Sequence, residues 1–496
     1  MTGFVRDIMI AAILGAGPLA DAFFVAFRLP NFLRRLFGEG AFNAGFVPLF
    51  AGTLEAEGRE EARRFAELAQ AVLTLALLLV VVPAVAFMPW LIRAFAPGFE
   101  PGSVRFEAAV ELTRITFPYL ALICLTALYS GVMNSLGRFA AAAAAPILLN
   151  LTLIAALTFA VGWFPSAAHA LAWGVTVAGI VQLGWMIVAA RREGMVLRPS
   201  RPRLSPNIRR LFVLILPAAI GAGVAQINLL ADVFFASLLP TGAVSFLYYA
   251  DRVNQLPLGV IGVAVGTALL PLLSRQIRAG DAAGALASQN RALELALLLT
   301  VPAALALIVT STPIVRVLFE RGAFGAAETA ATAAALAAYA VGLPAYVLGK
   351  VLTPGFFARQ DTRTPVKIAV ASLLTNIALN LALIGPLGHV GIALATALSN
   401  WLNAVLLFRR LRGGGLLAID ARLRRRLPRI LVAAQLMALG LWALIPYLGA
   451  LLPDTLALVA LIGAGGLGFV ALAHLGGATD LREIGALLAR AGRRRA

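Results

Sequence analysis

The chain has 496 residues, of which 61% are hydrophobic and 13% are charged, and its formal net charge is +18. Soluble domains average about 45–50% apolar and about 25% charged residues, so this composition excludes an ordinary soluble protein and indicates a polytopic membrane protein. The basic excess is typical of cytoplasmic loops, and we therefore expect a bilayer and no nucleic acid as partner. The single cysteine, Cys124, excludes a disulfide framework and a cysteine-based metal site.

Taken in chain order, the hydrophobic stretches predict about fourteen transmembrane helices, since a helix needs roughly 20 apolar residues to cross a bilayer. Glycine and proline mark several boundaries, for example at residues 15–18, 97–102 and 240–242. We therefore expect an all-α polytopic fold. The predicted spans are 1–15, 19–50, 64–96, 106–135, 139–163, 167–190, 208–239, 243–274, 286–312, 328–357, 364–385, 388–410, 428–449 and 452–476.

Arginine and lysine alternate between successive loops. Basic stretches lie around residues 59–64, 138, 191–210, 275–278, 359–367, 409–429 and 482–495. The intervening loops, near residues 15, 98, 163, 240, 325, 388 and 451, are poor in both, apart from Arg93, Arg105, Arg316 and Arg321. Because positive charge accumulates on the cytoplasmic side, both termini are expected in the cytoplasm, which requires an even number of spans.

A weak internal repeat predicts how the spans are grouped. Residues 117–150 resemble residues 343–376, and the spacing from Pro118 to Asn150 equals that from Pro344 to Asn376. Repeats of this kind are typical of transporters, whose site lies at the repeat interface. The expected parts are an N-lobe (1–190), a cytoplasmic linker (191–207), a C-lobe (208–410), a basic linker (411–427), two further helices (428–476) and a basic tail (477–496).

The first two hydrophobic stretches carry an unusual number of charges. They contain Arg6, Asp7, Asp21, Arg28, Arg34, Arg35 and Glu39. A charge at the centre of a bilayer costs at least about 2.5–3.5 kcal/mol unless it faces a partner or water. These charges therefore predict a polar cavity inside a helical bundle.

Three motifs then resemble a known family. GFVRD, DAFFVAFRLPNFLRRLFGEGAFNAGFVPLF and YYADRVNQLPLGVIGVAVGTALLPLLS closely resemble the MurJ/MviN lipid II flippases of the MOP exporter superfamily. The resemblance implies two six-helix lobes around a central cavity, alternating access, and two further helices that form a lipid-facing groove. It implies export of lipid II, the undecaprenyl-pyrophosphate-linked peptidoglycan precursor, across the bacterial inner membrane. The peptidoglycan-synthesis machinery would then be a candidate partner.

The chain departs from the family pattern at its start. Family members usually carry a further N-terminal segment with a Ser-Arg pair, whereas here Met1 begins just before Gly3. The first predicted helix has about 15 residues and measures about 22 Å, which is short for about 30 Å of hydrocarbon. We expect either that the natural product has a longer first helix or that this chain lacks one cavity arginine.

The resemblance also implies the substrate site. Arg6, Arg34 and Arg252 match the family's cavity arginines, and Ser245 matches a functional serine. Several guanidinium groups suit a pyrophosphate, because arginine binds phosphate bidentately and stays charged. In the alternative interpretation these arginines form structural ion pairs with Asp7, Glu39 and Asp251. The predicted set is completed by Asp21, expected to balance charge or gate the cavity, and by Arg28, which with Arg35 could instead snorkel to the interface.

A second polar group comprises Asp232, Asn376, Asn380 and Thr396. Oxygen ligands with a single carboxylate suit a hard monovalent cation such as Na⁺. Related proteins have a sodium site at these positions, with a second carboxylate where this chain has Asn380. Hydrogen bonds between helices are the alternative role.

Three function classes compete. An exporter of drugs or of another lipid-linked oligosaccharide is the closest alternative, although a drug exporter should have few cavity cations. A membrane enzyme should show a carboxylate cluster in a sizeable loop, and the long loops here are basic, so we expect no enzyme.

An anionic substrate and a cationic cavity predict that the membrane potential is the main driving force, since one charge crossing 100 mV gains about 2.3 kcal/mol.

Overall fold

The computed structural model describes residues 2–34 and 42–479, and of residues 44, 216–227, 229 and 260–268 it describes the backbone alone. Within these ranges the regular elements are helices, together with one isolated bridge between Arg321 and Phe324. Several helices begin at a serine or aspartate that accepts a hydrogen bond from a backbone N–H, which is the usual N-cap. These caps are Ser103, Ser166, Ser205, Asp281 and Asp420.

The chain forms two compact units. The first comprises residues 1–245 together with Arg321–Gly325, and the second comprises Phe246–Glu320 and the chain from Ala326 onward. The first unit contains α1 (Thr2–Leu14), α2 (Pro18–Arg34), α3 (Asn43–Ala56), α4 (Arg59–Ala86), α5 (Met88–Phe95), α6 (Val104–Thr116), α7 (Tyr119–Ser135), α8 (Phe139–Ala155), α9 (Ala167–Arg192) and α10 (Pro206–Ser237).

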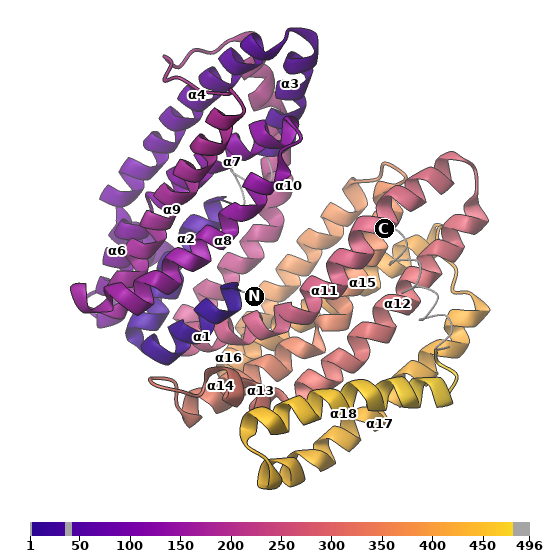
Figure 1. Cartoon of the computed structure of the whole chain (residues 1–496). Helices are drawn as coiled ribbons and strands as arrows, with labels where there is room; N and C mark the ends of the chain where they lie inside the picture. Colours follow the sequence, from indigo (N-terminus) through magenta and orange to yellow (C-terminus); the bar gives the residue numbers. More distant parts are fainter. Residues whose placement is uncertain (1, 35–41, 480–496) are drawn as a thin grey trace. The chain divides into compact units, whose positions relative to one another are not determined.

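In the first unit α7 and α8 both pack against α9, and α2 packs against α6 (Figure 1). A stack of aromatic rings joins α3 to α4: Phe46 lies 5.2 Å from Phe42, 5.5 Å from Phe50 and 5.6 Å from Phe65, measured between ring centroids. Offset aromatic stacking adds to the hydrophobic gain of burying these side chains. The stack therefore holds α3 against the start of α4.

The second unit begins within α11 (Ala243–Arg278). Its helix α12 packs against four others, and the last two helices form a hairpin, drawn in yellow in Figure 1. The elements after α11 are α12 (Ala282–Val309), α13 (Ser311–Phe319), α14 (Ala326–Val341), α15 (Leu343–Phe357), α16 (Arg363–Gly413), α17 (Ala421–Leu451) and α18 (Asp454–Leu475).

The all-α polytopic prediction is confirmed. Nine helical segments in the described part of the chain are long and apolar enough to cross a membrane. One of them, α16, contains two predicted spans, because Gly388 interrupts it with a φ of 54° that only glycine adopts easily. The remaining predicted spans fall on α1, on α2 with α3, on α10 and on α11. Helix α1 has 13 residues, and the longer natural first helix stays a prediction.

The internal repeat recurs in the helix boundaries. The predicted span 106–135 consists of α6 and α7, which meet at Phe117–Pro118, and the span 328–357 consists of α14 and α15, which meet at Gly342. Proline lacks the N–H that would continue the helical bonding, so Pro118 and Pro344 explain why both spans break at equivalent positions.

The boundary between the two compact units lies later in the chain than the predicted boundary between the two lobes. Helix α10, which was expected to open the C-lobe, groups with the first unit, as does the start of α11. The reason is packing: α10 contacts α3, α4 and α5, and its C-terminal end contacts the turn that precedes α6. The spacing of hydrophobic stretches gives no information on which earlier helices a crossing helix will contact.

Candidate functional site

Asp21 lies in the first turn of α2 and is completely buried. One carboxylate oxygen accepts from the backbone N–H of Gly242 at 2.7 Å, and the other accepts from the N–H and the hydroxyl of Ser245 at 3.0 and 2.6 Å. These groups belong to the start of α11, whose first N–H groups have no partner within the helix. Asp21 is therefore an N-cap supplied by a distant helix, favoured by the positive end of the helix dipole.

Further contacts surround this cap in the first unit. The Ala323 N–H donates to the Ala12 carbonyl at 2.8 Å, and a Cβ on Gly15 would lie 2.5 Å from the Ala323 oxygen. The Gly98 N–H donates to the Ser237 hydroxyl at 3.2 Å, and Arg105 donates to the Leu239 carbonyl at 3.1 Å. Four predicted extracytoplasmic loops, near residues 15, 98, 240 and 325, thus meet at one end of the unit, as loops on one side of a membrane should.

Arg6 is 6% exposed and is held by two neighbours. Its Nε and Nη2 donate to Asp7 Oδ1 at 2.9 and 2.6 Å, and Nη1 donates to Asn150 Oδ1 at 2.8 Å. The guanidinium also lies 5.7 Å from the centre of the Phe27 ring. This contact with Asp7 is the structural ion pair expected from the sequence as the alternative role of Arg6. The positive charge of Arg6 nevertheless lies beside α1 and α2.

Asn150 was not predicted as a functional residue, yet it orients Arg6. Its position ends the first copy of the internal repeat, and its counterpart in the second copy is Asn376. In the second unit Asn376 donates to the Thr396 hydroxyl at 3.3 Å and accepts from Asn380 at 3.1 Å. The repeat therefore places in each half an asparagine that hydrogen-bonds another span. Alignment of the two copies is the sequence signal by which Asn150 could have been found.

The other predicted arginines have separate surroundings. Arg34 is half-buried, donates to Asn31 Oδ1 at 3.1 Å and lines a cavity of the first unit. Arg28 is half-buried in the same helix. Arg252, in the second unit, is half-buried, and its guanidinium lies 4.8 Å from the centre of the Tyr248 ring. Arg6 and Arg34 belong to one unit and Arg252 to the other, while Arg35 and Glu39 fall outside the described residues.

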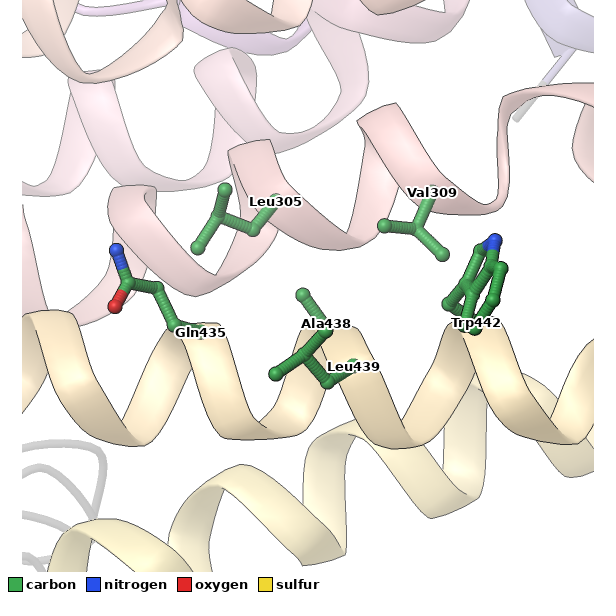
Figure 2. Close-up of a pocket in the computed structure, with 6 residues that line it drawn as sticks. All are labelled: Leu305, Val309, Gln435, Ala438, Leu439 and Trp442. Atoms are coloured by element: carbon green, nitrogen blue, oxygen red, sulfur yellow. The ribbon is translucent and has the colours of Figure 1, made fainter.

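An apolar pocket of about 570 Å³ lies between α12 and α17. Leu305 and Val309 face Ala438, Leu439 and Trp442 across it, and Gln435 lines the end of the pocket opposite Trp442 (Figure 2). Trp442 and Leu439 are 69% and 61% exposed, which is costly in water but favourable against lipid. A hydrocarbon chain suits this lining.

Comparison with known proteins identifies the family. The family model described as "Lipid II flippase MurJ" matches residues 10–458. A "Probable lipid II flippase MurJ" of Rhizobium meliloti (strain 1021) is 48% identical over 452 residues, covering 90% of this chain and 84% of the relative. The chain belongs to the lipid II flippase MurJ family.

Other matches agree with this assignment. A "Lipid II flippase MurJ" of Burkholderia cenocepacia is 39% identical and covers 84% of this chain and 81% of its own length. A solved "Lipid II flippase MurJ, inward closed conformation" superposes with a TM-score of 0.81 at 26% identity, covering 96% of both chains. A multidrug MATE transporter of the MOP superfamily has a TM-score of 0.72 at 14% identity, over 84% of this chain and 94% of its own, which shows a shared fold.

Membership of the MurJ family makes the chain a polytopic membrane transporter and not an enzyme. In the described residues no three histidine, cysteine or acidic side chains gather as a metal site. Of the predicted sodium ligands, Asn376, Asn380 and Thr396 contact one another in the second unit, whereas the buried Asp232 belongs to the first. The amide–hydroxyl contacts match the interhelical alternative, and the buried Asn380 Oδ1 has no donor among the described residues.

Proposed function

We propose that this protein is a lipid II flippase that carries the undecaprenyl-pyrophosphate-linked precursor from the cytoplasmic to the periplasmic leaflet of the inner membrane by alternating access. The observation that carries the proposal is the 48% identity to a MurJ relative over 90% of the chain. Substrate, direction and mechanism are inferences from that relationship, and the chemistry of the described residues supports them.

The side chains suit such a substrate at both of its ends. Arginines at positions 6, 28, 34 and 252 offer planar, permanently charged donors for a pyrophosphate. The apolar pocket between α12 and α17 offers a surface for the polyprenyl chain. Drug exporters of the shared fold provide a weaker alternative, since their similarity here is 14% identity and a cationic site disfavours cationic drugs.

The cap on α11 suits a gate. Alternating access requires contacts that hold one end of the transporter closed and that break when the other end closes. The Asp21 carboxylate is engaged by Gly242 and Ser245, so Asp21 and Ser245 would reach a substrate only after the cap had opened. We infer that these two residues act as closing contacts of the transporter. The loop charges predict that this end of the molecule faces away from the cytoplasm and that both termini lie inside.

Energy would come mainly from the membrane potential. Export carries the negative pyrophosphate toward the positive side, and the same potential favours the inward return of an empty cationic site. Asn376, Asn380 and Thr396 would offer oxygen atoms to a Na⁺ ion, while Asp232, the carboxylate expected from the sequence, belongs to the first unit. Such an ion would shift the balance between two conformations only if its affinity for them differed.

Depletion in the source cell tests the proposal directly. Loss of the protein should cause lipid II to accumulate on the cytoplasmic face of the inner membrane while its synthesis continues. A plasmid copy should reverse the accumulation, and a copy carrying Arg252→Ala should not. Normal export after complete depletion, in a cell without a second flippase, would contradict the proposed function.

A further inference from the structure

The first unit contains a small cavity of about 250 Å³ that none of the roles above uses fully. It is lined by residues of α2, α3, α7, α8 and α9. Its polar lining residues are Arg34, Asn43, Tyr119, Thr126, Ser130 and Gln182. All six belong to the same compact unit.

Hydrogen bonding within α7 leaves two hydroxyl groups of the lining as acceptors. The Thr126 hydroxyl donates to the Leu122 carbonyl, and the Ser130 hydroxyl donates to the Thr126 carbonyl, each at 2.8 Å. Both hydrogens are therefore committed to the helix, and the oxygens keep only lone pairs for a ligand.

Gln182 is the most informative residue of the lining. It is 2% exposed, and its Nε2 donates to the Ala145 carbonyl at 2.7 Å, which fixes the orientation of the amide. Its Oε1 is buried and receives no hydrogen bond from any described residue, and the same holds for Asn43 Oδ1. Buried acceptors are normally satisfied, so these two oxygens indicate a ligand that brings hydrogen-bond donors.

The charge of Arg34 narrows the chemistry of that ligand. A metal or ammonium ion could satisfy the oxygens, but the guanidinium would repel it. A simple anion would suit Arg34 and leave the acceptors unsatisfied. A group that joins hydroxyl or amide donors to a phosphate satisfies both requirements, and a glycosyl phosphate is such a group.

The size of the cavity limits how much of a glycan it accepts. At about 30 Å³ per water molecule, it holds the volume of roughly eight waters, and it lies below the ~300 Å³ at which ordinary ligand pockets begin. One sugar ring fits this volume, whereas a disaccharide with an attached peptide does not.

We propose that this cavity is a sugar subsite that accepts the ring attached directly to the pyrophosphate of a polyprenyl glycolipid. Arg34 faces the sugar-linked phosphate, and the Gln182 and Asn43 oxygens accept from hydroxyl or amide groups of that ring. The identity of the glycolipid rests on the proposed function; the subsite itself rests on the cavity and its acceptors.

Binding measurements on the full-length protein in lipid nanodiscs test the subsite. The two probes are undecaprenyl pyrophosphate and the same lipid carrying one N-acetylated sugar. We expect the wild type to bind the glycosylated probe more tightly, and Gln182→Leu to reduce that preference about tenfold. The reason is that a site that hydrogen-bonds a ligand group no longer discriminates for that group once the protein acceptor is removed. Thr176→Val is the matched control, since Thr176 on the same helix donates to the Ile115 carbonyl and does not line the cavity.

The outcomes separate the two proposals. A preference unchanged in Gln182→Leu, or an equal loss for both probes, would overturn the subsite. A wild type that binds both probes equally would overturn the subsite and leave the flippase proposal standing, whereas binding of neither probe would contradict both. If Gln182→Leu fails to fold, Ser130→Ala removes a second acceptor at the helix surface and must show the same selective loss.

Discussion

At the scale of single residues, the charges of the first helices have partners that their sequence spacing does not reveal. Asp21, Val25 and Arg28 share a helical face in the sequence. In the structure, Asp21 instead binds the start of α11, and Arg6 binds Asp7 and Asn150. The cost of an unpaired charge in a membrane predicts that a partner exists, but not which residue provides it.

The Asp21 cap gives the first prediction. Asp21→Asn removes the charge and turns one acceptor into a donor that faces the Gly242 N–H, so the cap should weaken by about 1–2 kcal/mol. In a variant carrying Cys124→Ala and Ala243→Cys, labelling by a membrane-impermeant maleimide should rise several-fold when Asp21→Asn is added. Ser245→Ala should have a smaller effect in the same direction. Unchanged labelling in both would exclude a gating role.

Arg252 gives the second prediction. Its guanidinium stacks beside Tyr248, so it combines a fixed plane with a permanent charge. Arg252→Ala should abolish flipping of lipid II in reconstituted vesicles, and Arg252→Lys should restore only part of it, because lysine lacks the planar fork that binds phosphate bidentately. Arg64→Lys, in an exposed surface ion pair, is the control and should flip normally. Full activity of Arg252→Ala would contradict a direct role.

At the scale of elements, one buried carboxylate on α12 gathers arginines from α12 and from the start of α17. Glu294 on α12 is 6% exposed, and it accepts from Arg422 at 3.1 Å, from Arg426 and from Arg291. The basic linker before the last helices was predicted from loop charge. Loop charge does not indicate that Arg422 and Arg426 point inward to a shared acid on a helix far away in the sequence.

Glu294 gives the third prediction. Glu294→Gln leaves several guanidinium groups together without their counter-charge, which should destabilise the second unit by about 2–4 kcal/mol, since removing one partner of a buried ion pair is strongly unfavourable. Thermal unfolding in detergent should show a clearly lower midpoint, and protease cleavage between α16 and α17 should become faster. Glu61→Gln, in an exposed pair, should change neither. Equal behaviour of the two variants would contradict this role.

The start of α16 gives the fourth prediction. Hydrogen bonds from Thr364 lower the pKa of Asp361 below its ordinary value of 3.8, and Asp361 Oδ1 accepts from the Thr364 N–H at 3.0 Å. A lowered folded-state pKa means that Asp361 stabilises the protein above the unfolded pKa and that this contribution disappears as pH falls through the folded pKa. Asp361→Asn should therefore lower the unfolding temperature at neutral pH, with the difference from wild type shrinking at acid pH. A constant difference would show that the charge is not involved.

At the scale of the whole molecule, hydrophobic periodicity and loop charge predicted the fold class, and the internal repeat paired Pro118 with Pro344, next to which the structure breaks both spans. The site was less accessible to prediction. Motif similarity selected Arg34, but the acceptor oxygens of Gln182 and Asn43 become meaningful only when α3, α7, α8 and α9 are packed together. Such contacts depend on tertiary packing, which spacing along one helix cannot encode.

The driving force gives the fifth prediction. Flipping should fall strongly when the membrane potential is collapsed while the sodium and proton gradients are kept, because each charge moved through 100 mV contributes about 2.3 kcal/mol. Removal of sodium alone should have the smaller effect. Undiminished flipping without a potential would defeat this mechanism, and a complete stop in Asp232→Asn would favour sodium coupling instead.

The buried cap on α11 also has a consequence for the energy balance of the cell. A protein with several arginines in its membrane interior would become a pathway for anions if it stood open at both ends. Charge-assisted hydrogen bonds contribute about 1.5–3 kcal/mol each, so even one of those made by Asp21 would hold an otherwise balanced open form below about 10%. The resting protein should therefore conduct almost no current, and cells that overproduce it should keep their membrane potential.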